Sequence, residues 1–430
     1  MFCRSSHRLL AKCGIFADVM RIFMWIVASV LACLACFPVC AQGESSSYDE
    51  AQLSAEAANF PSDDSVRVSL LTCSPGQEVY SLYGHTAIRC VDYTRGTDVV
   101  FNYGVFSFSQ PHFIWRFVLG KCDYMVDATY YHFFERAYAQ RGSQVTEQVL
   151  NLTSAEANAV QRYLLVNCLP ENCEYRYNFL YNNCTTMVRD AIERCVDGTV
   201  IYQTREPRQT TRQILHHYTR MHPWAAEGND LLLGSAVDTI ASDRSAMFAP
   251  ELMMHYADNA QIQRADGSVR PLVSSTDVLV PGRDVQTEAE FPLSPRALFA
   301  LLLCLSVLLV LIEYLTHRHF TVVDVVFLAL QGMVGVLLLF MALFSLHPAV
   351  DSNWLLWPLN PLSLLGLGVI LLGRQRAKNL WWVFDFGVLT LFLLFYLWIP
   401  QDFGNIVVPL TMCLLTRPIS FYLCNRKSRK

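Results

Sequence analysis

Five apolar stretches follow one another in the C-terminal third of the chain. Each has close to the roughly 20 residues that a helix needs to cross a bilayer, so this region is expected to fold inside a membrane. The composition agrees, because 53% of the 430 residues are hydrophobic and 16% are charged, whereas average soluble domains carry about 25% charged residues. The stretches are residues 297–315, 322–346, 354–372, 380–399 and 406–423.

Basic residues at alternate junctions predict the orientation of these stretches. The first junction contains Arg318, the third contains Arg374 with two further basic residues, and the chain ends in a basic run. The second and fourth junctions, 347–353 and 400–405, contain no Lys or Arg. Because Lys and Arg favour the cytoplasmic side of a membrane, the first and third junctions and the C-terminus are predicted to be cytoplasmic. Residues 42–296 are then exported.

The N-terminus has the parts of a secretory signal peptide. Arg21 precedes an apolar run over residues 22–39, and small residues follow the run. We therefore predict a signal peptide over residues 1–41, cleaved at its end. Two alternatives stay open: the run remains as an uncleaved anchor, or Cys33 or Cys36 is a lipidation site.

The rest of the exported region divides into a tether and a folded domain. Residues 42–64 are rich in Ser, Ala and Asp and are predicted to be a flexible tether. Residues 65–290 combine period-two apolar patterns with helical patterns, which predicts an α+β domain with a small antiparallel sheet. Residues 291–430 form the predicted all-α membrane domain of five helices. The expected strands cover residues 66–72, 86–92 and 99–106, and the expected helices cover residues 111–119, 132–141, 154–167 and 185–195.

The exported domain holds seven of the fifteen cysteines, an odd number. In an oxidising compartment six of them can pair and one stays free, which leaves room for a reactive thiol without identifying it. Cys168 and Cys173 lie five residues apart across a turn that contains proline, and we predict a disulfide between them. The seven are Cys73, Cys90, Cys122, Cys168, Cys173, Cys184 and Cys195.

Cys184 has the clearest sequence reason to be reactive. It follows two asparagines, which favour turns and helix N-caps, so a helix is predicted to begin at Asn183 or Cys184. The positive end of a helix dipole and its free N–H groups favour a thiolate, and the same groups can hold an oxyanion. We therefore predict that Cys184 is a nucleophile, with Asn183 and Thr185 as oxyanion or substrate contacts. Half of a disulfide is the alternative role for Cys184.

His85 is the predicted base for this nucleophile. It follows Gly84, which allows close approach of backbone or substrate, and it opens an apolar-alternating strand, so its ring is expected at a sheet edge. Asn102 lies on the next strand and can orient the ring, completing a Cys-His-Asn arrangement. Asp92 and Asp98 remain alternatives to Asn102, and a plain surface or core position remains the alternative for His85.

Three motifs resemble the Lnb-type lipoprotein N-acyltransferases of bacteria. They are residues 82–89 (LYGHTAIR), 101–104 (FNYG) and 178–186 (NFLYNNCTT). The order of signal, exported domain and membrane base also resembles that family. The order of histidine before cysteine is similar to circularly permuted papain-like (NlpC/P60-like) folds, and the resemblance implies such a fold for the exported domain. Further matching segments are LGS at 233–235 with Asp238, MFAP at 247–250, HP at 347–348 and NPL at 360–362.

The resemblance implies an acyltransferase of the bacterial inner membrane with its catalytic domain in the periplasm. Cys184 would take an acyl chain from a phospholipid as a thioester, and His85 would help to pass it to the α-amine of a diacylglyceryl-cysteine lipoprotein. Tyr83, His347 and Asn360 are further substrate-binding candidates. The implied partners are the phospholipid, the diacylated lipoprotein and the membrane. No cofactor, metal or nucleic acid is expected, because the sequence shows no metal-ligand spacing, phosphate loop or broad basic patch.

Polar residues in the membrane region have two interpretations. Glu313, Asp324, Asp385 and Arg417 are costly in lipid, and bonds between helices are the simplest reason for their presence. Polar residues on the outer side are instead candidates for a lipid-access groove below the site; they are His347, Asp351, Asn353 and Asn360.

A basic group follows the helix that is predicted to begin at Cys184. It consists of Arg205, Arg208 and Arg212. We expect these residues to lie on a solvated face, and contact with phospholipid phosphate, which arginine suits, is the alternative.

Two other function classes remain open. A membrane-anchored cysteine peptidase or peptidoglycan amidase would use the same Cys–His pair in the same compartment, without a stable acyl-thioester. A scaffold or receptor would hold Cys184 in a disulfide and carry no activity. Five apolar helices with polar residues on the outer side favour a lipid substrate, because a hydrolase needs only one anchor.

Overall fold

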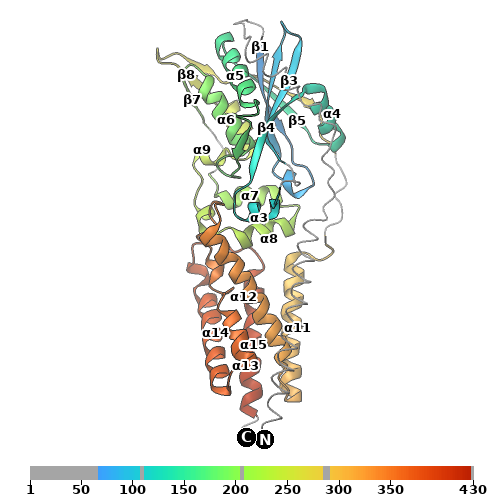
Figure 1. Cartoon of the computed structure of the whole chain (residues 1–430), viewed down its shortest axis with the longest axis vertical. Helices are drawn as coiled ribbons and strands as arrows, with labels where there is room; N and C mark the ends of the chain where they lie inside the picture. Colours follow the sequence, from blue (N-terminus) through green and yellow to red (C-terminus); the bar gives the residue numbers. More distant parts are fainter. Residues whose placement is uncertain (1–65, 107–110, 204–207, 284–290, 428–430) are drawn as a thin grey trace.

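A domain built on a β-sheet stands at one end of the molecule, and a bundle of long helices stands at the other (Figure 1). This arrangement agrees with the predicted α+β domain followed by a helical membrane domain. The predicted signal peptide (1–41), the tether (42–64) and Arg205 lie outside the described residues. The structure, a computed structural model, describes residues 66–106, 111–203, 208–283 and 291–427.

Seven antiparallel strands form the main sheet, in the order β10-β5-β1-β2-β3-β4-β6. The three strands predicted from alternating patterns are confirmed as β1, β2 and β3, which pair in sequence. A smaller sheet has the order β7-β8-β9. The strands are β1 (Val66–Cys73), β2 (His85–Asp92), β3 (Thr97–Val105), β4 (Asp123–Tyr130), β5 (Val145–Leu150), β6 (Glu174–Arg176), β7 (Thr199–Ile201), β8 (Gln261–Gln263), β9 (Val269–Pro271) and β10 (Val273–Val280).

Helices cover both faces of the main sheet. On one face Leu70 and Ile88 pack with Val160 of α5 and Val188 of α6 in one core cluster, and on the other Phe134 of α4 belongs to a second cluster. Thr153 caps α5 in a capping box, and the helix covers the range predicted from the sequence. The helices of this domain, with its 3-10 turns, are η1 (Val79–Ser81), α3 (Phe113–Val118), α4 (Tyr131–Arg141), α5 (Ser154–Asn167), α6 (Cys184–Cys195), α7 (Thr211–Thr219), α8 (Pro223–Leu232), η2 (Ser235–Asp238), α9 (Asp243–Ala246) and α10 (Pro250–Asp258).

The membrane domain contains the five predicted helices, but the third is shorter than expected. Four helices are long and apolar enough to cross a membrane, and α13 has only ten residues. The chain before α13 cannot continue the helix, because it holds Pro358 and Pro361 and because the Asn360 side chain accepts the N–H of Leu362 at 2.9 Å. The elements are α11 (Pro295–Thr316), α12 (Thr321–Phe344), η3 (Trp354–Leu356), α13 (Ser363–Leu372), α14 (Gln375–Phe395), η4 (Tyr396–Trp398) and α15 (Val407–Lys427).

Charged side chains join the membrane helices, as predicted. Arg417 of α15 donates to Glu313 of α11 at 3.0 Å and to Asp324 of α12 at 2.8 Å. His319 lies between the two carboxylates, 2.6 Å from Asp324. All four groups are thus paired, which is the condition under which charge is tolerated away from water.

Backbone hydrogen bonds dock the exported domain on the membrane domain. The N–H of Leu346 donates to the carbonyl of Leu119 at 2.9 Å, and the N–H of Gly234 donates to that of Ala349 at 2.7 Å. A Cβ at Gly234 would stand 2.3 Å from the backbone carbon of Ser352, so only glycine fits there. The two domains therefore meet along their backbones at close range.

Arg212 holds the segment that makes this contact, so the prediction of a solvated face was wrong for this residue. Its side chain is 1% exposed and pairs with Asp230 at 2.8 Å and with Asp238 at 2.7 Å. It also donates to the carbonyls of Leu233 and Gly234, at 2.9 and 3.1 Å. Because its guanidinium is buried and bonded to two carboxylates and two carbonyls, Arg212 is not placed to bind a lipid phosphate. Arg208 is exposed.

We expect Arg212→Met to destabilise the protein by about 3–5 kcal/mol, because it leaves the buried carboxylate of Asp230 and the partly buried one of Asp238 without their cation. Thermal unfolding of the full chain in detergent micelles measures the effect. Arg208→Met is the matched control, since it removes an exposed arginine four residues earlier in the chain. A melting midpoint for Arg212→Met equal to that of the control would contradict the role of these ion pairs.

Candidate active site

Cys184 is at the start of α6, and His85 is at the end of the main sheet where β1 leads into β2. In Figure 1 this end of the sheet faces the membrane helices. β1 ends there, and the chain returns through Gly84 into β2. Gly84 has a φ of +78°, and a Cβ on it would stand 2.6 Å from the carbonyl oxygen of Cys73. Glycine is therefore required at the turn that delivers His85 to the first position of β2.

His85 and Asn102 lie on the same face of neighbouring antiparallel strands. The His85 Nε2 atom is 3.2 Å from the Asn102 Oδ1 atom. The two alternative carboxylates are engaged elsewhere: Asp98 pairs with Arg89 at 2.6 Å, and Asp92 accepts the N–H groups of the turn that follows β2. Of the three candidates, only Asn102 contacts the ring of His85.

Cys184 is the first residue of α6, as predicted, and Asn183 is its N-cap. The Asn183 Oδ1 atom accepts the N–H groups of both Thr185 and Thr186 at 2.9 Å. Those two N–H groups are therefore occupied by the cap, and an oxyanion contact at this helix start stays a prediction. The Asn183 amide is also used, because it donates to the carbonyls of Phe179 and Phe248 at 2.8 and 2.9 Å.

The N–H of Cys184 itself is the donor that the cap leaves available. In the part of the chain that the structure describes, this N–H has no acceptor. A Cβ placed on Gly104 would lie 3.6 Å from the Cys184 Cβ, so β3 passes close to the start of α6. The Thr185 hydroxyl lies 3.8 Å from the Cys184 sulfur and 3.1 Å from the Thr86 hydroxyl.

The two groups shift each other's pKa in opposite directions. Burial alone raises the pKa of a thiol, but the charge and hydrogen bond of His85 and the N–H of Thr86 outweigh it and lower the pKa of Cys184. Burial likewise opposes protonation of His85, yet Cys184 and Asn102 raise its pKa. Both shifts favour a thiolate–imidazolium pair.

Cys184 differs in this respect from the other cysteines of its domain. Burial raises the pKa of each of the remaining six, and it raises that of Cys73 to about 12. All seven are free thiols, so the predicted disulfide between Cys168 and Cys173 is absent and that prediction was wrong. The Cys173 sulfur instead lies 3.5 Å from the carbonyl oxygen of Pro170.

Several neighbours of the site were not predicted. Cys73 lies opposite His85 in the β1–β2 register. Tyr138 of α4 hydrogen-bonds Cys73, and the Arg141 guanidinium lies over the Tyr138 ring at 4.4 Å. The positive charge of Arg141 lowers the pKa of His85. Strand pairing with β2 could have pointed to Cys73. Tyr138 and Arg141 lie one turn apart on α4, but the sequence does not show that α4 packs against this end of β1.

The further substrate-binding candidates are held in other contacts. The Tyr83 hydroxyl accepts the amide of Asn229 at 2.8 Å. The His347 Nε2 atom bonds the carbonyl of Phe117 at 2.6 Å. Asn353 is 4% exposed and donates to the carbonyl of Leu231 at 2.8 Å. The Asn360 side chain accepts the N–H of Leu362, and Asp351 is exposed. These bonds occupy most of the candidates, and the lipid-access groove stays a prediction.

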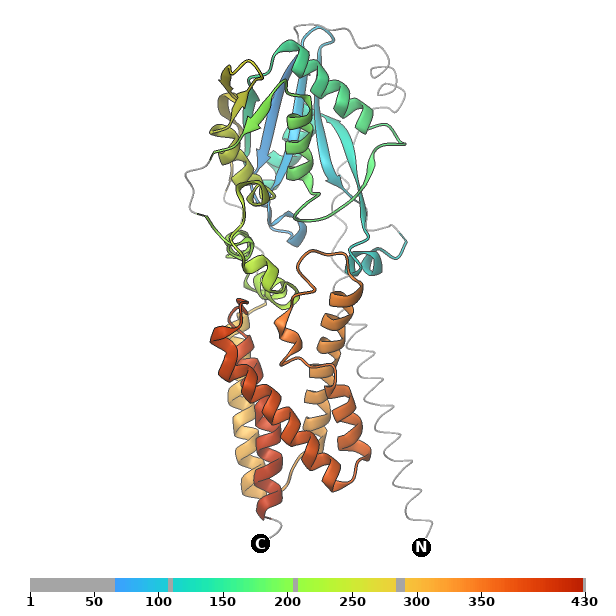
Figure 2. The same ribbon diagram turned by 90° about the vertical axis from the view of Figure 1, so that its left-hand side faces the viewer.

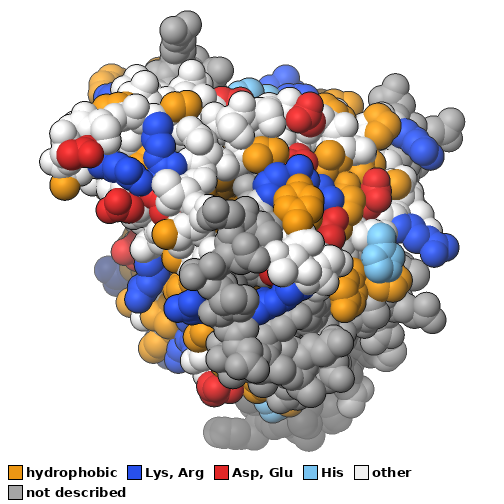
Figure 3. All heavy atoms as spheres, turned by 90° about the horizontal axis from the view of Figure 1, so that it is seen from above, with side chains coloured by type: hydrophobic (Ala, Val, Ile, Leu, Met, Phe, Trp, Pro, Cys, Tyr) orange, Lys and Arg blue, Asp and Glu red, His pale blue; other side chains and the backbone are white. Residues whose placement is uncertain are grey.

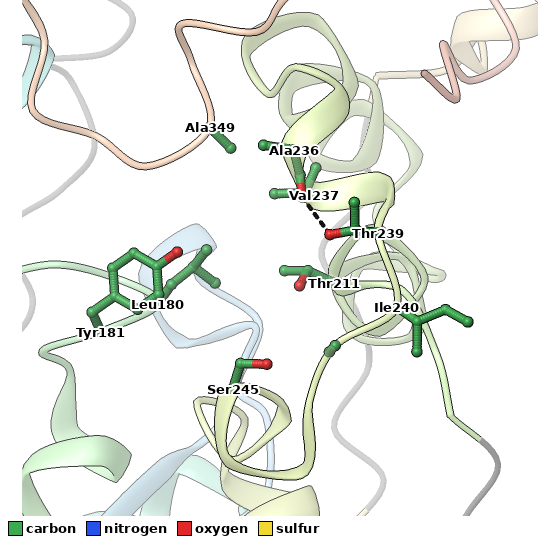
Figure 4. A pocket seen from close by; sticks show the side chains of 10 residues that line it. Leu180, Tyr181, Thr211, Ala236, Val237, Thr239, Ile240, Ser245 and Ala349 are labelled. Carbon is green, nitrogen blue, oxygen red and sulfur yellow. Dashed lines mark hydrogen bonds between the residues drawn. The ribbon is translucent and has the colours of Figure 1, made fainter. Parts of the chain in front are cut away.

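A cavity of about 150 Å³ lies at the junction of the two domains (Figure 4). Leu180 and Tyr181 face it from one side, Val237 and Ser245 face it from the other, and Ala349 closes it from the membrane domain. None of the predicted site residues lines it. The Cys184–His85 pair therefore lies apart from this cavity.

The fold and the site together define a class of membrane protein with an exported α+β domain. In this domain a cysteine begins a helix, and a histidine and an asparagine lie on two neighbouring strands. The comparisons with known proteins agree. Residues 56–217 match the Lnb N-terminal periplasmic domain, and residues 286–429 match the Lnb transmembrane domain. The chain belongs to the Lnb family. It is a multi-pass inner-membrane protein with a periplasmic domain. No curated protein and no solved structure matches it, and the papain-like character of the exported domain stays a prediction.

We expect iodoacetamide to alkylate Cys184 at a pH below the ordinary thiol pKa, because the thiolate is the reactive form and the pKa of Cys184 is lowered. In His85→Ala the pH at which alkylation of Cys184 is half-maximal should rise, because the thiolate loses its neighbouring cation while Cys184 stays buried. The measurement is the alkylation rate of Cys184 against pH, read by peptide mass spectrometry. Cys195, whose pKa burial raises, is the internal control in the same helix. Equal rates for both thiols at neutral pH would contradict the charge pair.

Proposed function

We propose that this protein is a lipoprotein N-acyltransferase that works through a Cys184 thioester. The observation that carries the proposal is the contact of Cys184, His85 and Asn102 at the sheet end facing the membrane helices. Membership of the Lnb family supports the same role. Both substrates are anchored in the membrane, which is consistent with a site at this end of the domain.

Acylation of Cys184 is the first step. The thiolate attacks the ester carbonyl of a phospholipid, and a carbon–sulfur bond forms. The N–H of Cys184 is placed to hold the oxyanion that develops. The ester carbon–oxygen bond then breaks, and the protonated His85 gives its proton to the departing alcohol of the lysophospholipid. The products are an acyl-thioester and a neutral imidazole.

Transfer to the lipoprotein is the second step. The free α-amine of the diacylglyceryl-cysteine attacks the thioester carbonyl, and neutral His85 takes the proton that the amine loses. A carbon–nitrogen bond forms and the carbon–sulfur bond breaks, which returns Cys184 to its thiolate and His85 to its protonated form. The product is a triacylated lipoprotein, and both catalytic groups are restored.

Asn102 positions the imidazole for both steps. Because Nε2 donates to Asn102 at 3.2 Å, Nδ1 is the ring nitrogen left for the sulfur and the reacting protons. An asparagine carries no charge, so it orients the ring without drawing the proton away from it. This is the role that the third member has in triads of this kind.

A membrane-anchored cysteine peptidase or amidase would use the same three residues. The two functions differ in the intermediate and the product. An N-acyltransferase accumulates a hydroxylamine-sensitive acyl-thioester when phospholipid is present and acceptor is absent, whereas a peptidase releases a peptide or amide fragment. Incubation with a phospholipid bearing a labelled acyl chain, followed by intact-mass analysis of the protein, separates the two.

In cells that lack lipoprotein N-acylation, the wild-type protein should restore triacylated lipoprotein N-termini, and Cys184→Ala should restore none. His85→Ala should lower the rate of acyl transfer by at least about 100-fold, the lower range of general base catalysis. Mass spectrometry of lipoprotein N-termini reads the outcome, and Cys195→Ala is the control in the same helix. Triacylated product from the Cys184→Ala variant would overturn the mechanism.

We expect Asn102→Ala to slow acyl transfer about tenfold or more, because a hydrogen bond to a charged group contributes about 1.5–3 kcal/mol. Asn102→Asp keeps an acceptor at the same place and should recover most of the rate. The same variants are compared for alkylation of Cys184 against pH, which reports the state of the His85 ring. If Asn102→Ala transfers the acyl chain at the wild-type rate, Asn102 does not position His85 for the reaction.

A further inference from the structure

The short helix α3 exposes large apolar side chains. Ile114 is 43% exposed, Trp115 is 56% exposed and Phe117 is 46% exposed, and no residue of the helix is buried. A helix of this kind at a water-facing surface would leave apolar area in contact with solvent without compensation. We therefore expect the exposed side of α3 to contact an apolar partner.

The end of the membrane helix α12 lies beside α3. The Trp115 ring centroid is 5.2 Å from that of Phe340, and the Ser345 hydroxyl donates to the carbonyl of Val118 at 2.7 Å. A Cβ on Gly120 would lie 2.7 Å from the N–H of His347. In Figure 2, α3 is the short teal helix beside the upper end of the orange bundle. The helix is thus held at the level where α12 ends.

The exposed face of α3 continues the apolar surface of α12. Leu343, Phe344 and Leu346 at that end are 65%, 59% and 57% exposed, and the rings of Phe344 and Phe340 lie 5.2 Å apart. Tryptophan is enriched where a bilayer meets water, and Trp115 stands at that level. By contrast, Figure 3 shows charged side chains of both signs scattered over the face that points away from the membrane helices.

A row of aromatic rings leads from α3 toward the site. Successive ring centroids are 6.2, 5.9, 4.8 and 4.0 Å apart. The middle ring, that of Phe106, lies two residues beyond Gly104, where an added Cβ would stand 3.6 Å from the Cys184 Cβ. The row therefore passes close to the nucleophile. The rings are those of Phe117, Phe113, Phe106, Tyr124 and Tyr177.

We propose that α3 inserts into the periplasmic leaflet of the membrane and that phospholipid reaches Cys184 along its aromatic row. The occupant is the acyl region of a phospholipid, because the surface is apolar, is continuous with a membrane helix and is joined by the aromatic row to the strand that lies beside Cys184. The insertion stands on the contacts of α3 alone, and the delivery of a donor lipid rests on the proposed acyltransferase function.

Photo-crosslinking to lipid tests the insertion without any turnover. The full chain with Cys184→Ala is placed in nanodiscs of phosphatidylethanolamine and phosphatidylglycerol, with some phosphatidylethanolamine carrying a diazirine in one acyl chain. After irradiation, adducts are mapped by peptide mass spectrometry. We expect adducts on Ile114, Trp115 or Phe117, at a level like that of the lipid-facing residues of α12. Tyr93, which is 61% exposed at the far end of β2, should carry none.

Two substitutions of Trp115 test the delivery. Trp115→Glu should lose the adducts and slow formation of the Cys184 acyl-thioester about tenfold, the factor that about 1.4 kcal/mol of lost binding produces. Trp115→Phe should keep both the lipid adducts and the rate of acyl-thioester formation. Tyr93→Glu is the control for an added surface charge. Melting midpoints of the variants are compared, so that a folding defect is recognised, and Ile114→Glu provides a second variant on the same face.

The outcomes separate this inference from the proposed function. Absence of adducts on α3, with adducts present on α12, overturns the insertion whatever the activity. Adducts on α3 together with unchanged thioester formation in both glutamate variants overturn the delivery and leave the acyltransferase function intact. Adducts on α3 in a protein that forms no acyl-thioester from any phospholipid overturn the proposed function and leave a lipid-inserted helix.

Discussion

The ion pairs of Arg212 hold together the segment through which the two domains meet. The guanidinium bonds the buried carboxylate of Asp230, the partly buried one of Asp238 and the carbonyls of Leu233 and Gly234. Beside these carbonyls, the backbone of Ser352 approaches so closely that Gly234 has no room for a side chain. A buried cation is tolerated when it is paired, and these bonds tie the contact segment to the helix that carries Arg212.

The site depends on a second pair of opposite charges, those of the Cys184 thiolate and the protonated His85. Burial alone would keep Cys184 protonated and His85 neutral, as it does for the thiols elsewhere in the domain. Each group removes that penalty for the other, because their charges are opposite and adjacent. The N-cap of α6 adds to this arrangement indirectly. By taking the N–H groups of Thr185 and Thr186, Asn183 leaves the N–H of Cys184 as the donor at the helix start.

Sequence patterns predicted the framework of this molecule well and its polar contacts less well. Strands β1 to β3, the capped start of α5 and the start of α6 follow from local periodicity and capping chemistry, which the nearest neighbours in the chain determine. The roles expected for Arg212 and Asn353 were wrong, because both side chains are buried. A sequence does not show whether a polar side chain faces water, lipid or a buried carbonyl. The third membrane segment was expected to be one helix, but Pro358, Pro361 and the turn that the Asn360 side chain stabilises shorten it.

The sequence by itself determined that this chain has an exported α+β domain on a helical membrane base. It singled out Cys184 and His85, with Asn102 as one of three candidates for the third member. Hydropathy, charge at the junctions and turn chemistry are local properties, so the sequence carries them directly. Only the tertiary structure decided that Asn102, and neither Asp92 nor Asp98, touches His85. It alone set α3 beside the end of α12 and left all seven exported cysteines unpaired. These facts depend on which distant segments the packing brings together, and no local pattern encodes that choice.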